Sequence, residues 1–276
     1  MTKCWFDYKT VIISGASSGI GKGIAERLIK EHGCNVIGIA RNEDRLMRFK
    51  EELGGCGHKF SYYTFDVSLE NKWQEFADTL KKEGIKPDIL INNAGILPKF
   101  DRFMHYTIEE IKKAMEINFF SCVYSMNALM PIILESDSSA IINVASSAAL
   151  CSLAGTSVYS ASKAALKGFT EAVREEHRGE CYIGLICPGF TKTDIFRNQS
   201  KSSDRAQKAM DLISTDCDKM VDSIIRGIWH KKDKMVFGMD AHFMDKGYKV
   251  FGTKCSLISS KVMKISGLDM FKSIFE

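Results

Sequence analysis

The sequence predicts an α/β fold, a doubly wound sheet of seven parallel strands with helices on both faces. Short β-branched segments alternate along the chain with longer segments of helical spacing, which is typical of βαβ units. The strand segments are almost wholly apolar, as expected where helices cover both faces of a sheet. The 276 residues are 45% hydrophobic and 26% charged, which suits a globular domain. No apolar run approaches the roughly 18 residues of a membrane span.

The predicted elements follow one another in a regular order. Ile20, Ile24 and Leu28 recur at i, i+4 and i+8, which is the pattern of an amphipathic helix. The predicted strands are 10–14, 35–40, 60–66, 88–91, 140–146, 182–187 and 235–237. The predicted helices are 20–32, 43–54, 70–84, 108–135, 158–178 and 217–230. We therefore expect one domain over residues 1–240, followed by a helical tail at 241–276.

Charge and cysteine content exclude several classes of protein. Lysine and arginine number 38 and aspartate and glutamate 34, and the net charge of +4 matches that of residues 227–276 alone. The rest is balanced, so we expect no nucleic-acid partner. The nine cysteines form no C-x-x-C pair, and the histidines are scattered. With no signal-peptide pattern at the start, we expect free thiols in the cytoplasm and no metal site.

A glycine-rich loop joins the first predicted strand to the first predicted helix. It reads Gly15-Ala-Ser-Ser-Gly19-Ile-Gly21. Glycine allows the tight turn and a close backbone approach to a pyrophosphate, while the helix N-terminus presents free N–H groups to the anion. The loop therefore predicts a dinucleotide site. Its residues are Gly15, Ser17, Ser18, Gly19, Ile20 and Gly21.

The end of the second predicted strand indicates which dinucleotide binds. A site for NAD places an acid there to bond the ribose 2′-hydroxyl, whereas this chain reads Ile39-Ala40-Arg41-Asn42. An arginine can bind the additional 2′-phosphate of NADP through charge-assisted hydrogen bonds. The sequence therefore favours NADP(H) over NAD(H). The alternative is that Arg41 is a solvated surface residue.

Polar residues recur at the ends of later strands. Asn92-Asn-Ala-Gly95 follows the fourth strand, and Ser146 closes the fifth. Tyr159 and Lys163 stand four residues apart on a predicted helix and therefore share one face of it. Parallel strands end at one edge of a sheet, so we expect these side chains to meet there.

These residues resemble the short-chain dehydrogenase/reductase family in its single-domain, Rossmann-like form. The resemblance covers about 1–240 and follows the family's order. The matching segments are SGASSGIG at 14–21, Asp66-Val67, NNAG at 92–95, Asn118, Ser146, Y-x-x-x-K at 159–163 and PGFTKT at 188–193. It implies hydride transfer between NADP(H) and an alcohol/carbonyl pair.

The resemblance also implies a role for each residue. Tyr159 would be the general acid, Lys163 would lower the pKa of Tyr159 and bond the nicotinamide ribose, and Ser146 would hold the carbonyl oxygen. Asn118 would prop a water that relays protons. The implied cofactor contacts are Asp66 and Val67 at the adenine, Asn93, Ala94 and Gly95 at the adenosine ribose, and Pro188, Gly189, Thr191 and Thr193 at the nicotinamide and diphosphate. Single residues could be surface hydroxyls or, at Asn118, a helix kink.

The substrate is predicted from the wall of the expected pocket. The wall residues are Ile96, Leu97, Ala148, Leu150, Leu153 and Phe190, with residues 195–215 as a lid. Their apolar character favours a lipophilic ketone or aldehyde, such as a steroid or a bile-acid-like carbonyl. A 3-oxoacyl thioester, with Lys192 and Lys201 at its phosphates, remains open. So do a non-catalytic NADP-sensing protein and a passive surface loop in place of the lid.

The tail and the expected partners complete the prediction. Leu257, Ile258, Val262, Ile265 and Leu268 lie roughly on one helical side among lysines, and Gly267 splits the segment into two helices. This side either docks on the domain or a partner subunit, or lies at a membrane surface or over the pocket. The resemblance implies a small-molecule substrate and a homodimer or homotetramer paired through helices 108–135 and 158–178.

Overall fold

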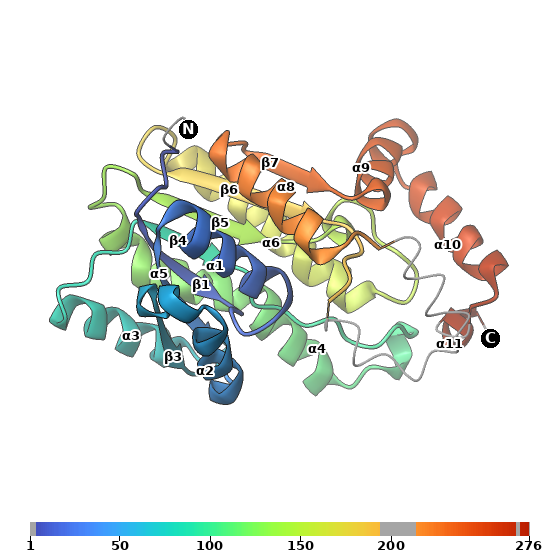
Figure 1. The fold of residues 1–276 in the computed structure, drawn as a ribbon. Coiled ribbons are helices and arrows are strands. Elements are labelled where there is room, and N and C mark those ends of the chain that lie inside the picture. Colours follow the sequence, from blue (N-terminus) through green and yellow to red (C-terminus); the bar gives the residue numbers. More distant parts are fainter. Residues whose placement is uncertain (1–3, 194–213, 269–270, 276) are drawn as a thin grey trace.

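The computed structural model describes residues 4–193, 214–268 and 271–275. Its seven strands form one all-parallel sheet in the order β3-β2-β1-β4-β5-β6-β7 (Figure 1). The strands are β1 (Thr10–Ser14), β2 (Asn35–Ala40), β3 (Phe60–Thr64), β4 (Ile89–Asn92), β5 (Ala140–Val144), β6 (Tyr182–Pro188) and β7 (Lys234–Phe237). The predicted fold class is confirmed. The third and fifth strands end two residues earlier than predicted, so Ser146 follows β5 without belonging to it.

The strand order reverses at β1. This strand pairs with β2 on one side, with Val11 beside Val36, and with β4 on the other, with Val11 beside Ile89. The chain therefore runs from β1 outward to β2 and β3 on one side, and then returns to place β4 on the other side of β1. Such a switch point opens a crevice outside the carboxyl ends of the strands, where ligands bind in folds of this kind.

All six predicted helices are present, one of them divided. The helices are α1 (Gly19–His32), α2 (Glu43–Glu52), α3 (Glu70–Lys82), α4 (Ile108–Met115), α5 (Ser121–Ile133), α6 (Ser157–Glu176), α8 (Cys217–Trp229), α9 (Met239–Phe251), α10 (Lys254–Ser266) and α11 (Lys272–Phe275). The short turns are η1 (Gly54–Lys59), η2 (Phe103–His105), the π-helical η3 (Glu116–Phe120) and η4 (Ser147–Ala149). The predicted helix 108–135 is α4, η3 and α5, and α9 forms the first part of the tail that was predicted to be helical.

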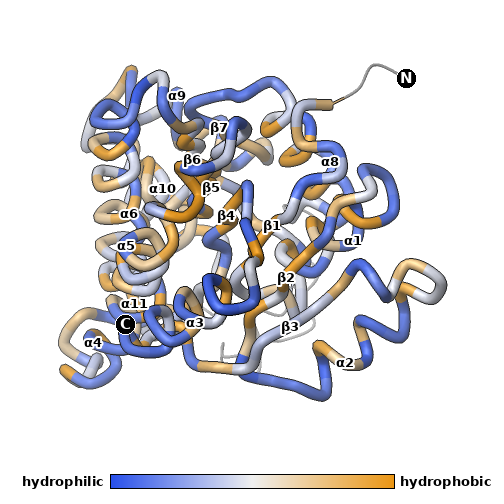
Figure 2. Tube along the Cα trace, turned by 90° about the vertical axis from the view of Figure 1, so that its left-hand side faces the viewer, coloured by the Kyte–Doolittle hydropathy of each residue, from blue (hydrophilic) through white to orange (hydrophobic). Residues whose placement is uncertain are grey.

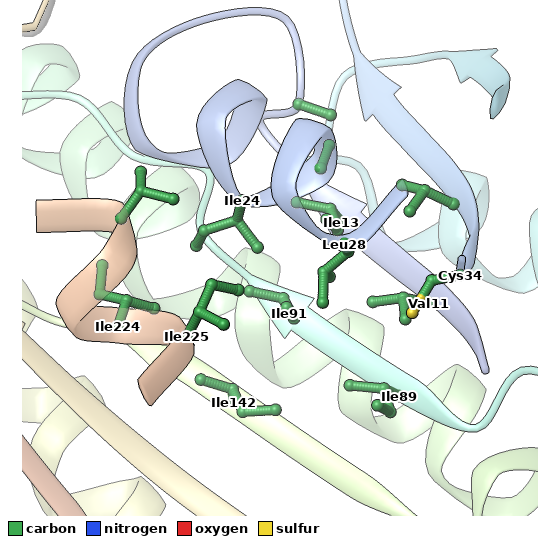
Figure 3. Packing of buried hydrophobic residues seen from close by; sticks show 14 of the residues in the cluster. Val11, Ile13, Ile24, Leu28, Cys34, Ile89, Ile91, Ile142, Ile224 and Ile225 are labelled. Atoms are coloured by element: carbon green, nitrogen blue, oxygen red, sulfur yellow. The ribbon is translucent and has the colours of Figure 1, made fainter. Parts of the chain in front are cut away.

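Helices cover both faces of the sheet. Val11 and Ile13 of β1 point to the face covered by α1 and α8, while Ile12 between them points to the face covered by α3, α5 and α6. Figure 3 shows the first of these interfaces. Its labelled residues include Ile24 and Leu28 of α1, Ile224 and Ile225 of α8, and Ile13, Ile89, Ile91 and Ile142 of the strands.

The distribution of apolar residues agrees with this layering. In Figure 2 the hydrophobic colour gathers on β2, β5 and β6 in the interior, while the helices alternate between hydrophobic and hydrophilic residues. All nine cysteines are free thiols, as predicted. None of the helices in the described part of the chain is long and apolar enough to cross a membrane.

The tail docks on the domain, but not through the side that the sequence suggested. Helix α10 ends at Gly267, whose φ of 61° is left-handed, so the predicted split is confirmed. Cys255 and Met263 of α10 are buried, and Met263 packs with Phe100. The side that the sequence suggested for docking, with Leu257, Ile258, Val262 and Ile265, is exposed instead.

Candidate active site

The glycine-rich loop has the geometry of a phosphate cradle. Gly15 and Gly19 have φ angles of 72° and 53°, a backbone region that favours glycine. A Cβ on Gly21 would lie 2.4 Å from both the Asn93 Nδ2 and the Gly15 carbonyl oxygen, so no side chain fits there. Ser18 at the start of α1 does not cap the helix with its side chain, and the first turn holds no acid. The N–H groups of α1 therefore face the crevice available to an anion.

Hydrogen bonds fix the end of β4 against this loop. The Ser14 hydroxyl accepts from the backbone N–H groups of Asn93 at 3.0 Å and Ala94 at 3.1 Å. The Asn93 side chain donates to the Ser14 carbonyl at 3.1 Å. The structure therefore brings Asn93, Ala94 and Gly95 beside the glycine-rich loop, and the Asn93 amide holds the loop in place.

A cleft of about 660 Å³ extends from this loop past the ends of β2 and β3. Its lining contains all the predicted phosphate-loop residues except Gly21, which lies beneath them, and it contains Arg41, Asp66, Val67, Asn93, Ala94, Gly95 and Thr193. Arg45 and Asn42 also line it and were missed. Arg45 stands in the first turn of α2, which begins three residues after β2 ends, so it lies at the same strand end as Arg41.

Arg41 and Asp66 face each other across the cleft. The Arg41 Nη1 lies 3.6 Å from the Asp66 Oδ2, and the arginine side chain is 60% exposed. Burial pushes the pKa of Asp66 upward, but hydrogen bonds from Ser68 and the charge of Arg41 outweigh it, so the pKa is lowered. Asp66 is therefore a carboxylate at neutral pH. An exposed pair of this kind contributes little stability, which leaves Arg41 able to turn to an anionic ligand.

The predicted catalytic residues meet at the carboxyl ends of β5 and β6. Tyr159 and Lys163 lie on α6, and Ser146 precedes η4. The buried Lys163 ammonium donates to the Val144 carbonyl at 2.9 Å. With Gly189 they line a second cavity of about 110 Å³.

The pKa values at this site differ from the expectation. Burial raises the pKa of the Tyr159 phenol, an effect that its hydrogen bond with Ser146 partly offsets. Burial likewise lowers the pKa of Lys163. The sequence predicted that Lys163 would lower the pKa of Tyr159. Here the ammonium is directed to Val144, and desolvation disfavours both charged forms. Tyr159 is therefore a neutral phenol, which is the form that donates a proton.

Asn118 lies in the π-helical turn that interrupts the predicted long helix, and it is fully buried. Its side-chain oxygen accepts from the Ile96 N–H at 2.8 Å, and its amide donates to the Ile96 carbonyl and the Ser162 hydroxyl, each at 3.0 Å. Both amide hydrogens are thus used. The side chain ties the segment after β4 to α6, so the water-holding role that the resemblance implied does not fall to its amide donors.

The loop after β6 carries the PGFTKT motif and is held by a residue that the sequence did not reveal. The Phe190 N–H donates to the Asp240 Oδ2 at 2.8 Å, and a Cβ on Gly189 would lie 2.0 Å from the Asp240 Oδ1. Asp240 belongs to α9, fifty residues along the chain, so no local spacing signals it. Pro188, Gly189 and Thr191 line the second cavity, as does Thr193, which also reaches the first turn of α1 beside Gly19.

The apolar wall of the second cavity is partly as predicted. Leu97, Ala148, Leu153 and Phe190 line it, and Phe100 joins them without having been predicted. Two predicted wall residues lie elsewhere. Ile96 lines the cofactor cleft, and Leu150 packs in a separate core cluster with Cys122 and Leu166. Met263, Phe271 and Ile274 of the tail pack against Leu97 and Phe100. The predicted lid falls almost entirely on residues 194–213, which lie outside the described residues.

A cluster of potential metal ligands lies at the opposite edge of the sheet. Cys4, Asp7 and His32 place their ligand atoms within 4.8 Å of one another. The sequence did not suggest this grouping, because the residues come from two segments. The Asp7 carboxylate already accepts from the Cys4 N–H at 2.7 Å and pairs with the His32 Nδ1 at 2.8 Å. The trio therefore ties the N-terminal segment to the end of α1.

Comparison with known proteins agrees with this geometry. A family model described as short chain dehydrogenase matches residues 9–204. The ketoacyl reductase HetN of Nostoc sp. is 34% identical over 66% of this chain, a match that spans 63% of HetN. The 3beta-hydroxysteroid dehydrogenase 2 of Eggerthella lenta is 31% identical over 71% of this chain and 76% of that protein.

Solved structures share the fold. The closed form of a serine dehydrogenase complexed with NADP+ has a TM-score of 0.73 at 25% identity, covering 82% of this chain and 93% of that one. A short-chain dehydrogenase/reductase from Burkholderia phymatum in complex with NAD has a TM-score of 0.77 at 23% identity, covering 94% and 97%. The chain belongs to the short-chain dehydrogenase/reductase family. It is an oxidoreductase that acts on an alcohol or carbonyl group of a small molecule with a nicotinamide cofactor.

Proposed function

We propose that this short-chain dehydrogenase uses NADP(H) to interconvert a carbonyl and a secondary alcohol on a lipophilic substrate. The observation that carries the proposal is the meeting of Ser146, Tyr159 and Lys163 in an apolar cavity that adjoins a cleft of dinucleotide size. Asn93 and Gly95 border both spaces, so the two lie side by side.

The residues of the cleft fit the cofactor. The glycine cradle and the N-terminus of α1 would hold the diphosphate, Arg41 and Arg45 the 2′-phosphate, and Asp66 and Val67 the adenine. The nicotinamide half would be bordered by Asn93, Ala94, Gly95, Pro188, Gly189, Thr191 and Thr193. When bound, the nicotinamide supplies or accepts the hydride.

The side chains of the second cavity handle the proton. In the reduction direction the neutral Tyr159 phenol donates its proton to the substrate oxygen, which would otherwise become an alkoxide. Ser146 holds that oxygen beside Tyr159. The phenolate that forms is stabilised by the Lys163 ammonium, one helical turn along α6. Asn118 acts indirectly, since it fixes the segment after β4 against Ser162 of the same helix.

NADP(H) is preferred over NAD(H) in this proposal because two arginines lie near the end of β2, and Arg41 stands directly after that strand, where an NAD site places an acid. Arg41 and Arg45 both line the cleft. Asp66 stands nearby at the end of β3, but its carboxylate is occupied by Ser68 and Arg41. Two guanidinium groups favour a 2′-phosphate, whereas an acid would favour a 2′-hydroxyl.

The substrate class follows from the cavity wall. Leu97, Phe100, Leu153 and Phe190 offer apolar surface, which suits a steroid, a bile-acid-like molecule or another lipophilic ketone or aldehyde. A 3-oxoacyl thioester is the second candidate, favoured by the likeness to the Nostoc ketoacyl reductase and by the exposed Lys192 beside the cavity.

The test is NADPH oxidation by the whole protein across steroids, bile-acid ketones, quinones, aldehydes and 3-oxoacyl thioesters. We expect turnover of a lipophilic ketone or aldehyde that disappears in Tyr159→Phe. Turnover confined to the thioesters would establish the second candidate. NADPH binding without turnover of any carbonyl would contradict both and would indicate an NADP-sensing protein.

The assembly and the compartment belong to the same proposal. We expect a homodimer or homotetramer paired through α4, α5 and α6, in line with the exposed Ile108 and Phe120 on that side. Sedimentation velocity would contradict this if it gave a monomer. The nine free thiols favour a reducing compartment such as the cytoplasm.

A further inference from the structure

Helices α9 and α10 together expose many large apolar side chains. Figure 1 shows the two helices at one end of the molecule, where α9 begins directly after β7. We call this exposed side the tail face. It contains Met239, Phe243, Val250, Phe251, Leu257, Ile258, Val262 and Ile265. Val250 is 73% exposed and Ile265 84%, whereas monomeric proteins keep contiguous apolar patches small.

The tail face is one side of two amphipathic helices. On α10, Ile258, Val262 and Ile265 recur at i, i+4 and i+7 and are exposed, while the buried Met263 lies on the opposite side of the helix. On α9, Met239, Phe243 and Val250 occupy the side opposite the buried Ala241 and Met244. The inner side already packs on the domain, so the apolar residues of the outer side are not needed to hold the tail in place.

Positive charge surrounds these apolar residues. The segment 246–268 contains five lysines and no acid. Lys249 pairs with the partly buried Asp245, which also pairs with Lys234. The other four lysines of the segment are exposed. They are Lys246, Lys254, Lys261 and Lys264. On α10 the tail face thus presents apolar side chains among three exposed lysines, and this helix contains no acid.

The combination of exposed apolar side chains and lysines indicates which partner the tail face binds. A second copy that paired through the same face would set the lysines of one chain against those of the other, at an electrostatic cost. An anionic lipid surface matches both properties, since its phosphates attract lysines and its acyl region accepts apolar side chains. We propose that the tail face binds the surface of an anionic lipid membrane.

The inner side of the same helix contacts the second cavity. Met263 of α10 packs with Leu97 and Phe100, both of which line that cavity. A membrane bound to the tail face would therefore lie on the far side of a helix that supports the cavity wall. Binding itself depends only on the tail face and is independent of the substrate assigned above.

The experiment is sedimentation of the full-length protein with two kinds of vesicle, phosphatidylcholine alone and phosphatidylcholine mixed with phosphatidylglycerol. We expect binding to the mixed vesicles that weakens at high salt. Two variants remove the two properties of the tail face. They are Ile258→Ser/Val262→Ser/Ile265→Ser and Lys254→Gln/Lys261→Gln/Lys264→Gln. Each should weaken binding by about tenfold or more.

Matched variants elsewhere on the surface distinguish binding by the tail face from nonspecific binding of the protein to vesicles. Met47→Ser/Leu69→Ser removes two exposed apolar residues, and Lys81→Gln/Lys82→Gln/Lys113→Gln removes three exposed charges. Neither should change vesicle binding by more than about twofold, because charge and apolar area act locally at the membrane. Thermal unfolding and NADPH binding check that every variant is folded.

Three results would overturn the proposal. The wild-type protein could fail to sediment with the phosphatidylglycerol vesicles. The matched variants could lose as much binding as the tail-face variants. The serine variant could convert an oligomer to a smaller species in sedimentation velocity while vesicle binding is unchanged, which would make a second copy the occupant of this face.

Discussion

The cofactor cleft and the substrate cavity lie at the same edge of one sheet, but they are built differently. The cleft is shaped by backbone, with Gly15 and Gly21 at positions where a Cβ would collide and the start of α1 open to an anion. The cavity is shaped by side chains from several segments, including Phe100 and the tail residue Ile274 behind it. Backbone geometry dictates residue identity, whereas an apolar wall accepts many residues.

The largest effect is expected in the substrate cavity, at Tyr159. Tyr159→Phe removes the proton donor but keeps the ring, so kcat should fall by roughly 10²–10⁴-fold while NADPH affinity is kept. Steady-state kinetics and fluorescence titration with NADPH measure the two quantities. Tyr182→Phe is the matched control, because its hydroxyl bonds the Lys232 carbonyl away from the site. Equal losses in both variants would show that Tyr159 has no special role.

The backbone character of the cleft is tested at Gly21. In Gly21→Ala the new Cβ would meet the Gly15 carbonyl at 2.4 Å, so the loop must shift and NADPH affinity should fall about a hundredfold. Gly168→Ala on α6 is the control, because nothing lies within 4 Å of its Cβ. That variant should bind NADPH normally and gain about 0.5–1 kcal/mol of stability. Normal NADPH binding by Gly21→Ala would contradict the cradle.

The arginines test which dinucleotide the cleft favours. Arg41→Asp replaces a donor by an acid at the end of β2, and the ratio of NADPH to NADH affinity should fall about 10–100-fold. Arg45→Ala should lower the ratio less, because one guanidinium remains. Arg48→Asp on the same helix, exposed and outside the lining of the cleft, serves as the control for charge. An unchanged ratio in Arg41→Asp would mean that Arg41 is a surface residue.

The side-chain character of the cavity is tested at Phe100. Phe100→Ala removes apolar surface from the wall, so KM for a bulky ketone should rise about tenfold while KM for NADPH stays constant. Phe103→Ala changes a nearby phenylalanine that is 66% exposed and should alter neither constant. A rise in KM for NADPH in Phe100→Ala would show that the two regions are less separate than their geometry indicates.

The same contrast explains what the sequence could predict. The alternation of strands and helices, the glycine cradle and the spacing of Tyr159 and Lys163 are local patterns. The alternation predicted the parallel sheet, and the structure places the cradle and the two side chains at the carboxyl ends of its strands. The roles of Asp240 and Phe100, and the choice of the buried side of α10, depend on contacts between distant segments. No local spacing in the sequence predicts such contacts. Ile96 and Leu150 show the same limit. Leu97 and Ala148, one and two residues away from them, line the cavity, whereas Ile96 lines the cleft and Leu150 packs in a separate core cluster.

The smallest expected effect is the change in the rate of carbonyl reduction with pH, which reports the protonation state of Tyr159. Burial raises the pKa of its phenol above the ordinary value near 10. Reduction needs the protonated phenol, so kcat/KM for the carbonyl at saturating NADPH should change by less than about twofold from pH 7 to 9 and fall only above that range. Oxidation needs the phenolate and should rise about tenfold per pH unit below the pKa.

Paired pH profiles of the two directions measure this difference. If Lys163 governed the phenol instead of burial, the pKa would lie lower and the reduction profile would already decline between pH 7 and 8. That decline would show that the ammonium leaves the Val144 carbonyl for the phenolate during turnover. A flat profile would mean that Tyr159 stays a neutral phenol throughout this pH range. The pKa of the proton donor in the substrate cavity would then be controlled by desolvation, whereas the shape of the cofactor cleft is controlled by backbone geometry.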